Sequence, residues 1–427
     1  MKKKTLLSFF ICAFISLQIK GQTITNYSLP KQITQHSFNF KGFALTLNDD
    51  VADEKGNHLL AGEIHAFEKE EQDRDTMINR VFELKGVVYD DKLGILITTD
   101  KNYKITKIVR SFIGEKIMYD TYKKQFTIGA LFFDYLKVDG RSFSAWQPVI
   151  ITTDITLKAR AFFVQRPYSC ILKNIIIEKD KIKIFARSNS NVTDNKSDEK
   201  AEVITVSLSK THVDTARPWI KVLDILSILQ TPHNDRGRLE LSDISKIGND
   251  YYFSTYNLNQ FNLKTSNHLY CLTKDKLTEK HSFADVLKLS HNFSDWININ
   301  EFFAAETNFI SLTHTGATKK EIIYTKTDTL FNVLLQKKIP LNDYADFYKM
   351  SLLPNGNTLL VAVNKTESWS YYLYDKNMEL LKEIDSNISK KYYPQNLQSI
   401  SNTAIKCIFY IDNVNKKDCL LQTVSVN

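Results

Sequence analysis

The sequence has few cysteines, few glycines and no cluster of basic residues. Five cysteines in 427 residues are too few for a disulfide-stabilised scaffold. The 56 lysines and arginines are interspersed with 48 acidic residues, whereas a nucleic-acid-binding protein concentrates its basic residues on one surface. After the first 20 residues, no apolar stretch reaches the roughly 20 residues that cross a membrane. We therefore expect neither a nucleic-acid partner nor a membrane span.

The first 21 residues have the pattern of a secretory signal peptide. Lys2–Lys4 form a basic head, and an uncharged apolar run follows over Leu6–Leu17. Gly21 is the small residue expected before a cleavage site. This order predicts removal of residues 1–21 and export to the periplasm or the medium as a mature chain of residues 22–427, beginning at Gln22. The abundance of Lys, Asn and Ile is typical of an AT-rich bacterial genome.

A lipid anchor is not expected, because Ile11, which precedes Cys12, is not the small residue that a lipoprotein cleavage site needs. The signal peptide contains four of the basic residues. The mature chain therefore keeps 52 basic and 48 acidic residues, a nearly balanced +4.

Four cysteines remain after cleavage, Cys170, Cys271, Cys407 and Cys419. A hairpin centred on Asn413 would place Cys407 and Cys419 opposite each other, close enough for a disulfide. The alternative is that both are buried free cysteines, which behave as small apolar residues.

Short runs rich in Ile, Val, Phe, Tyr, Leu and Thr alternate with polar turns along the whole mature chain. Similar strand–turn–strand elements recur every 47–65 residues, with their turns at Asp100, Asp154, Lys210, Asp275, Asp328 and Asp375. Such a period, with about four strands per unit, predicts an all-β fold of radially repeated units. The stretch Trp219–Gln230 departs from the pattern and predicts a short helix or an edge strand.

This arrangement resembles a β-propeller. Six units fall between residues 58 and 385, and the three strands expected over 396–426 need a fourth. An N-terminal strand at Phe38–Leu47 is expected to supply it, which closes a ring of seven blades and leaves no open edge. Six blades with an extra N-terminal piece is the alternative. The resemblance rests on period and strand pattern, since no blade signature is present, and Asn and Asp are expected to replace glycine at turns.

The most suggestive polar run directly follows Trp219–Gln230. It contains His233, Asp235, Arg236 and Arg238 in a predicted loop, where ligand-binding residues are often found. The two guanidinium groups suit a carboxylate or sulfate, and His233 is a potential general base. The alternative is a solvated connection between blades.

No other motif predicts a catalytic, cofactor or metal site. The sequence has no Gly-x-Ser-x-Gly elbow, no glycine-rich phosphate loop and no His-Glu-x-x-His helix, so we expect no cofactor. The nine histidines show no metal-ligand spacing, and Asp49, Asp50 and Asp53 before Gly56 are read as a polar hairpin turn, not as a calcium loop. The tryptophans are expected to pack between blades, although exposed rings would suit glycan binding. Their positions are Trp146, Trp219, Trp296 and Trp369.

Two functions fit these observations. The first is an exported β-propeller that binds a protein, peptide or glycan on one face without catalysis. The second is a polysaccharide hydrolase or lyase whose site at the channel mouth draws residues from several blades.

Overall fold

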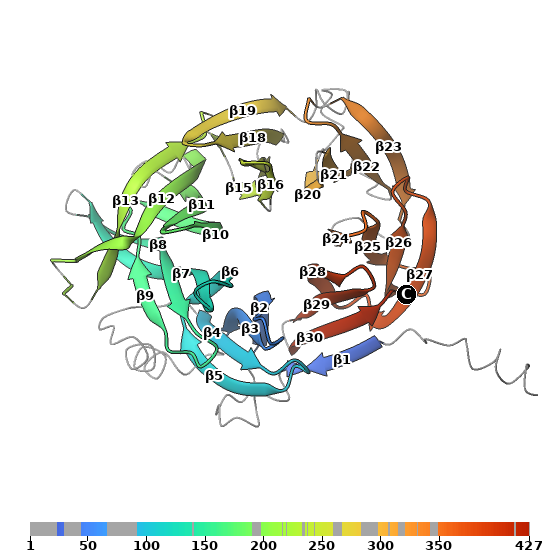
Figure 1. The fold of residues 1–427 in the computed structure, drawn as a ribbon, viewed down its shortest axis with the longest axis horizontal. Helices are drawn as coiled ribbons and strands as arrows, with labels where there is room; N and C mark the ends of the chain where they lie inside the picture. Colours follow the sequence, from blue (N-terminus) through green and yellow to red (C-terminus); the bar gives the residue numbers. More distant parts are fainter. Residues whose placement is uncertain are drawn as a thin grey trace, which may run out of the picture.

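The chain folds into four-stranded antiparallel units that follow one another around a ring (Figure 1). The computed structural model describes residues 24–29, 44–65, 92–138, 141–189, 198–215, 217–218, 220–232, 235–236, 238–242, 244–258, 267–282, 298–305, 308–314, 321–330, 332–341, 349–413 and 416–426. The predicted signal peptide therefore lies outside the described residues. Within the described residues no helix is long and apolar enough to cross a membrane.

In the part of the chain that the structure describes, thirty strands form six sheets. The first sheet contains β2 (Ala44–Ala52), β3 (His58–His65), β4 (Lys92–Thr99) and β5 (Ile105–Ser111). Two further units follow, β6 (Ile113–Asp120), β7 (Gln125–Val138), β8 (Arg141–Thr153) and β9 (Arg160–Phe163), then β10 (Ser169–Glu178), β11 (Lys181–Asn189), β12 (Asp198–Val213), β13 (Lys221–Gln230) and the short β14 (Asp235–Arg236).

The second half of the ring has the same construction. Its strands are β15 (Arg238–Leu241), β16 (Ser245–Ile247), β17 (Asp250–Leu258), β18 (Asn267–Thr273) and β19 (Lys276–Ser282), then β20 (Asn298–Ala305), β21 (Asn308–His314), β22 (Glu321–Thr327) and β23 (Val333–Pro340), and then β24 (Lys349–Leu352), β25 (Thr358–Val363), β26 (Ser368–Tyr374) and β27 (Leu380–Ser389). The last sheet contains β28 (Tyr393–Ser401), β29 (Ala404–Asn413), β30 (Lys416–Ser425) and the N-terminal β1 (Ile24–Ser28).

The ring closes through antiparallel pairing of β1 with β30, from Ile24 opposite Val424 to Ser28 opposite Leu420. The predicted closure by strands from both chain ends is confirmed, but the predicted strand is wrong. Phe38–Leu47 overlaps β2, which is an innermost strand of the first sheet in Figure 1. The true closing strand is short and carries Thr, Asn and Ser, so its sequence shows little apolar alternation.

The units β6–β9 and β10–β13 are joined into one nine-stranded sheet by a single parallel pair, Val222 opposite Phe163. Dividing this sheet at that pair gives seven units among the described residues, and the count of seven blades is our interpretation of the pairing. This parallel pair forms because β12 continues to Val213. The turn predicted at Lys210 is therefore wrong. Residues 207–210 are instead a bulge in the β12–β13 ladder, and the stretch predicted as a helix or edge strand is β13.

The predicted turns at Asp100, Asp154, Asp328 and Asp375 all follow a strand and share one local geometry. In each, a carboxylate oxygen of the aspartate accepts backbone N–H groups two and four residues further on, as in the bonds from Thr156 and Lys158 to Asp154. These bonds help to lower the pKa of Asp154, with the Thr156 side-chain hydroxyl as the largest contribution.

In the three of these turns whose left-handed position the structure describes, that position is not occupied by Asn or Asp. Positive φ falls on Tyr103, Leu157 and Met378, three residues after an aspartate, and all three side chains are buried. The expectation that Asn and Asp themselves adopt this conformation is therefore wrong for these turns. The aspartate fixes the turn by accepting hydrogen bonds, and burial of an apolar side chain offsets the cost of the left-handed backbone, which is about 1–2 kcal/mol.

We expect Leu157→Gly to be more stable than Leu157→Ala by about 1 kcal/mol, the reverse of the usual order for these two residues. Both variants lose the packing of the leucine atoms beyond Cβ, but only glycine relieves the backbone, which has φ 62° at this position. Urea denaturation of the two variants measures the difference. A more stable alanine variant would show that the backbone at position 157 is not strained.

The two C-terminal cysteines do not face each other. Cys407 pairs with Gln422 and Cys419 with Tyr410, and both are free and buried. The hairpin turns one and a half residues later than predicted, and this moves the register by three residues. Since an odd shift reverses the face of every side chain, Cys407 lies in the core beside β26 and Cys419 in the core beside β2. The free-cysteine alternative fits this geometry.

Candidate functional site

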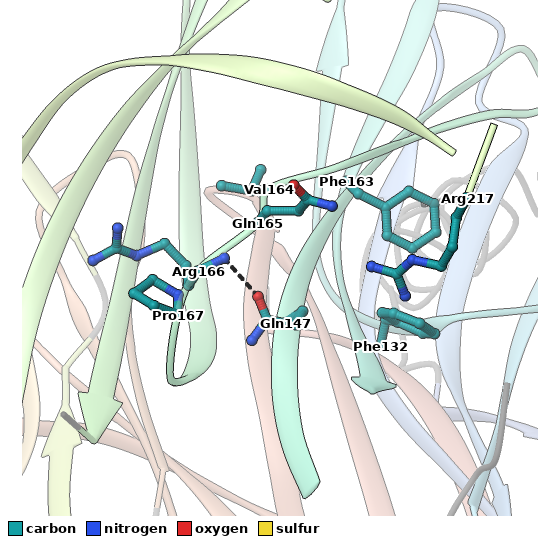
Figure 2. Close-up of a pocket in the computed structure, with 8 residues that line it drawn as sticks. All are labelled: Phe132, Gln147, Phe163, Val164, Gln165, Arg166, Pro167 and Arg217. Atoms are coloured by element: carbon teal, nitrogen blue, oxygen red, sulfur yellow. Dashed lines mark hydrogen bonds between the residues drawn. The ribbon is translucent and has the colours of Figure 1, made fainter. Parts of the chain in front are cut away.

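A pocket of about 300 Å³ lies where the units β6–β9 and β10–β13 meet (Figure 2). Half of its lining is apolar and half carries amide or guanidinium groups. The lining residues are Phe132, Gln147, Phe163, Val164, Gln165, Arg166, Pro167 and Arg217. They come from β7, β8, β9, the segment that leaves β9, and the β12–β13 connection. The innermost strands β6 and β10 contribute none of them, so the pocket lies toward the outside of the ring (Figure 1).

The β9–β10 connection follows β8 closely, and this forms one wall of the pocket. Val164 N–H donates to Pro148 O at 3.0 Å, and Arg166 N–H donates to Gln147 Oε1 at 2.8 Å. The Gln147 amide nitrogen donates in turn to Tyr168 O at 2.9 Å. Both ends of this buried amide are thus satisfied by backbone, which holds the wall rigid.

The apolar wall is a group of phenylalanine rings. The Phe132 and Phe163 rings meet edge to face with centroids 5.1 Å apart, and Phe112 packs edge-on against both. Ile220 and Val222 extend this core from the β12–β13 hairpin. The extension of β12 past Lys210 therefore brings Arg217 to the pocket.

The charges around the pocket are balanced in pairs. Arg217 Nε donates to Asp214 Oδ2 at 3.0 Å, and the Gln165 amide nitrogen donates to the same oxygen at 2.6 Å. Figure 2 shows the Arg217 side chain on the side of Phe132 and Phe163, while the Arg166 side chain points away from them.

The Arg166 side chain enters a second, buried group of polar residues. Its guanidinium lies 3.1 Å from Glu202 Oε2, and the Glu202 side chain is completely buried. Tyr168 and Gln230 also donate to Glu202, and the guanidinium lies 4.6 Å from the centre of the Tyr168 ring. Arg166 Nε is buried without a hydrogen-bond partner. Burial, followed by the charge of Glu202, raises the pKa of the neighbouring Cys170 thiol far above its usual value.

The described part of the predicted ligand-binding segment lies beside the start of β12, the strand that also carries Glu202. The backbones of Asp235 and Arg236 pair with Glu199 and Asp198 at the start of β12, and Arg238 begins β15 opposite Leu258. His233 lies outside the described residues. The structure thus brings the backbone of this segment beside Glu199, whose Oε2 lies 3.9 Å from Arg187 Nη1. Their role stays a prediction.

A third cluster of polar side chains connects the first and last sheets. Asp50 on β2 is bonded by Lys406 Nζ of β29 at 2.6 Å, by Tyr103 at 3.1 Å and by His58 Nδ1 at 2.8 Å. Burial raises the pKa of Asp50, but the Lys406 charge and the bonds to His58 and Lys406 outweigh it, so the pKa is lowered.

The neighbouring Asp49 is equally buried and links three inner strands. It accepts bonds from the Ile117 backbone of β6 and the Gln398 side chain of β28. Only Asp53 forms the hairpin turn predicted for this segment, with Gly56 at φ 79°. The reading of Asp49 and Asp50 as turn residues is therefore wrong, because both lie within β2.

Among the residues that the structure describes, no group of three His, Cys, Asp or Glu side chains could hold a metal ion. Trp369 is buried between the last two sheets, in agreement with the predicted packing role, and Trp146 contacts Phe133. Trp219 and Trp296 lie outside the described residues.

The radial order of the sheets and the closure by β1 define a β-propeller. No family model matches the chain, and no curated protein matches it. Solved structures resemble it in fold. A Dyadobacter fermentans protein of unknown function is 10% identical, with a TM-score of 0.48 over 96% of this chain and all of the other.

Two further structures resemble the chain over most of its length. YCF48 bound to D1 peptide is 9% identical, with a TM-score of 0.47 over 96% of each chain. The propeller domain of the Trilobed protease from Pyrococcus furiosus is 7% identical, with a TM-score of 0.44 over 90% of this chain and 96% of the other.

The amino-acid sequence alone did not predict this pocket. Its residues are spread over residues 132–217, and the single signal was Gln147-Pro148 beside a tryptophan in the middle of an apolar run.

Proposed function

We propose that this chain is an exported β-propeller that binds a protein, peptide or glycan and carries out no catalysis. The observation that supports binding is the chemistry of the pocket lining. It combines phenylalanine rings with glutamine and arginine side chains, and none of the eight residues is of a type that commonly acts as a nucleophile or a general base. The backbone-bonded wall is already in a fixed geometry, which lowers the entropic cost of binding.

The test is a peptide-array, glycan-array and polysaccharide-cleavage screen on protein that starts at Gln22. We expect retention of one ligand class without turnover. Arg217→Gln and Gln165→Ala should weaken retention about tenfold or more, whereas Arg160→Gln, on the exposed side of β9, should leave it unchanged. Cleavage of any polysaccharide with turnover would instead support the hydrolase or lyase and contradict this proposal.

Export is the second part of the proposal, and the pattern of residues 1–21 supports it. We expect the protein from its native host to be recovered outside the cytoplasm with Gln22 as its first residue. N-terminal sequencing of the fractionated protein measures this directly. An intact N-terminus on cytoplasmic protein would contradict export without affecting the binding proposal.

A further inference from the structure

We propose that the pocket of Figure 2 receives an uncharged aromatic side chain presented by a peptide or protein partner. This inference rests on the proposed binding function and specifies its ligand. Size, charge and the nature of the walls each restrict what the pocket can hold.

Size limits the ligand to a single group. A volume of about 300 Å³ is at the lower end of ligand pockets. It suits one large side chain and is too small for an oligosaccharide or a folded segment. The mouth is reachable from solvent, because Gln165 and Pro167 are both exposed.

Charge balance disfavours an ionic ligand. Arg217 is bonded to Asp214, and the Arg166 guanidinium points away from the pocket toward Glu202. A ligand carboxylate that approaches Arg217 also approaches Asp214, and a ligand ammonium group meets the positive charge of Arg217. Either would be desolvated without a free counter-charge in the lining, which is costly.

The hydrogen-bonding groups of the wall are largely engaged. Both ends of the Gln147 amide bond to backbone, and the Gln165 amide nitrogen bonds to Asp214. A sugar with hydroxyls on every side would lose bonds to water here that the wall does not replace. An apolar group loses none.

The walls favour an aromatic over an aliphatic group. Phe132 and Phe163 already meet edge to face, so a further ring can extend the same packing. Arg217 on the same side offers a cation to the face of a ring. An aliphatic side chain of equal size makes neither contact.

Saturation-transfer NMR on protein starting at Gln22 tests this, with N-acetyl-phenylalaninamide as the probe. The comparison probes are N-acetyl-leucinamide, which is aliphatic, the α-amide of N-acetyl-aspartic acid, which carries a carboxylate, and methyl glucoside, which is a sugar. We expect saturable binding of the phenylalanine probe, at least fivefold tighter than the leucine probe. Equal or tighter binding of the aspartate probe or the glucoside would overturn the proposal, as would no saturable binding of the phenylalanine probe.

Variants locate the bound probe. Gln165→Trp adds a ring at the exposed mouth and should weaken binding of the phenylalanine probe at least tenfold. Arg160→Gln should leave the affinity for this probe unchanged. In Gln165→Cys, saturating probe should slow maleimide labelling, since the four native cysteines of the mature chain are buried. Probe binding that Gln165→Trp does not weaken would place it elsewhere. If an array ligand is retained by Gln165→Trp, the binding function stands and the pocket assignment fails.

Discussion

Lys406→Met is expected to lower the free energy of unfolding by about 3–5 kcal/mol, because it leaves a buried carboxylate without its cation. Asp50 is fully buried, and Lys406, itself only 6% exposed, lies 2.6 Å from it. Urea denaturation at pH 7 measures the loss. Lys391→Met removes an exposed lysine from the turn that precedes β28 and should change stability by less than about 0.5 kcal/mol.

The loss should also depend on pH. Burial is the largest influence on Asp50, and without Lys406 it should raise the Asp50 pKa above the unfolded value. A raised folded pKa contributes stability below the unfolded pKa and loses it as pH rises. The variant should therefore approach the wild type as pH falls from 7 toward 5. A difference that stays constant over this range would show that Asp50 does not become protonated in the variant.

Arg166→Met should destabilise the protein by a similar amount, about 3–5 kcal/mol, through the other buried ion pair. Glu202 is fully buried, and after the change it keeps only the neutral donors Tyr168 and Gln230. The loss of stability should be greatest at the contact between the units β6–β9 and β10–β13. Thermal unfolding and amide exchange of β9 and β10 measure it.

The double variant Arg166→Met/Glu202→Gln is the matched control. It removes both charges, so most of the lost stability should return. Arg160→Met, which changes an exposed arginine at the start of β9, should have little effect. If Arg166→Met alone costs less than about 1 kcal/mol, Glu202 is not held as a buried anion.

The repeat could be predicted from the sequence because strands and turns follow local chemistry. The aspartate turns at Asp100, Asp154, Asp328 and Asp375 each join the last two strands of a unit, and their hydrogen bonds lie within five residues. The turn predicted at Lys210 is wrong because this prediction also relied on local chemistry. Its polar neighbours resemble a turn, but the ladder to β13 continues beyond the bulge through contacts that local sequence does not encode.

The pocket and the buried ion pairs could not be predicted, because their partners are distant in the chain. Asp50 and Lys406 are 356 residues apart, and Arg166 and Glu202 are 36 residues apart. A charged residue in an apolar strand is a sign of such a site, and Glu202 and Lys406 both have that context. The sign does not identify the partner.

The pairing of β1 with β30 also sets an order of events during synthesis. Ile24 is synthesised 400 residues before its partner Val424. The first strand must wait unpaired while every other sheet is completed, and β30 is exposed along one edge until β1 arrives. Closure of the ring thus joins two strands that are synthesised far apart in time, and it cannot occur before β30 has left the ribosome.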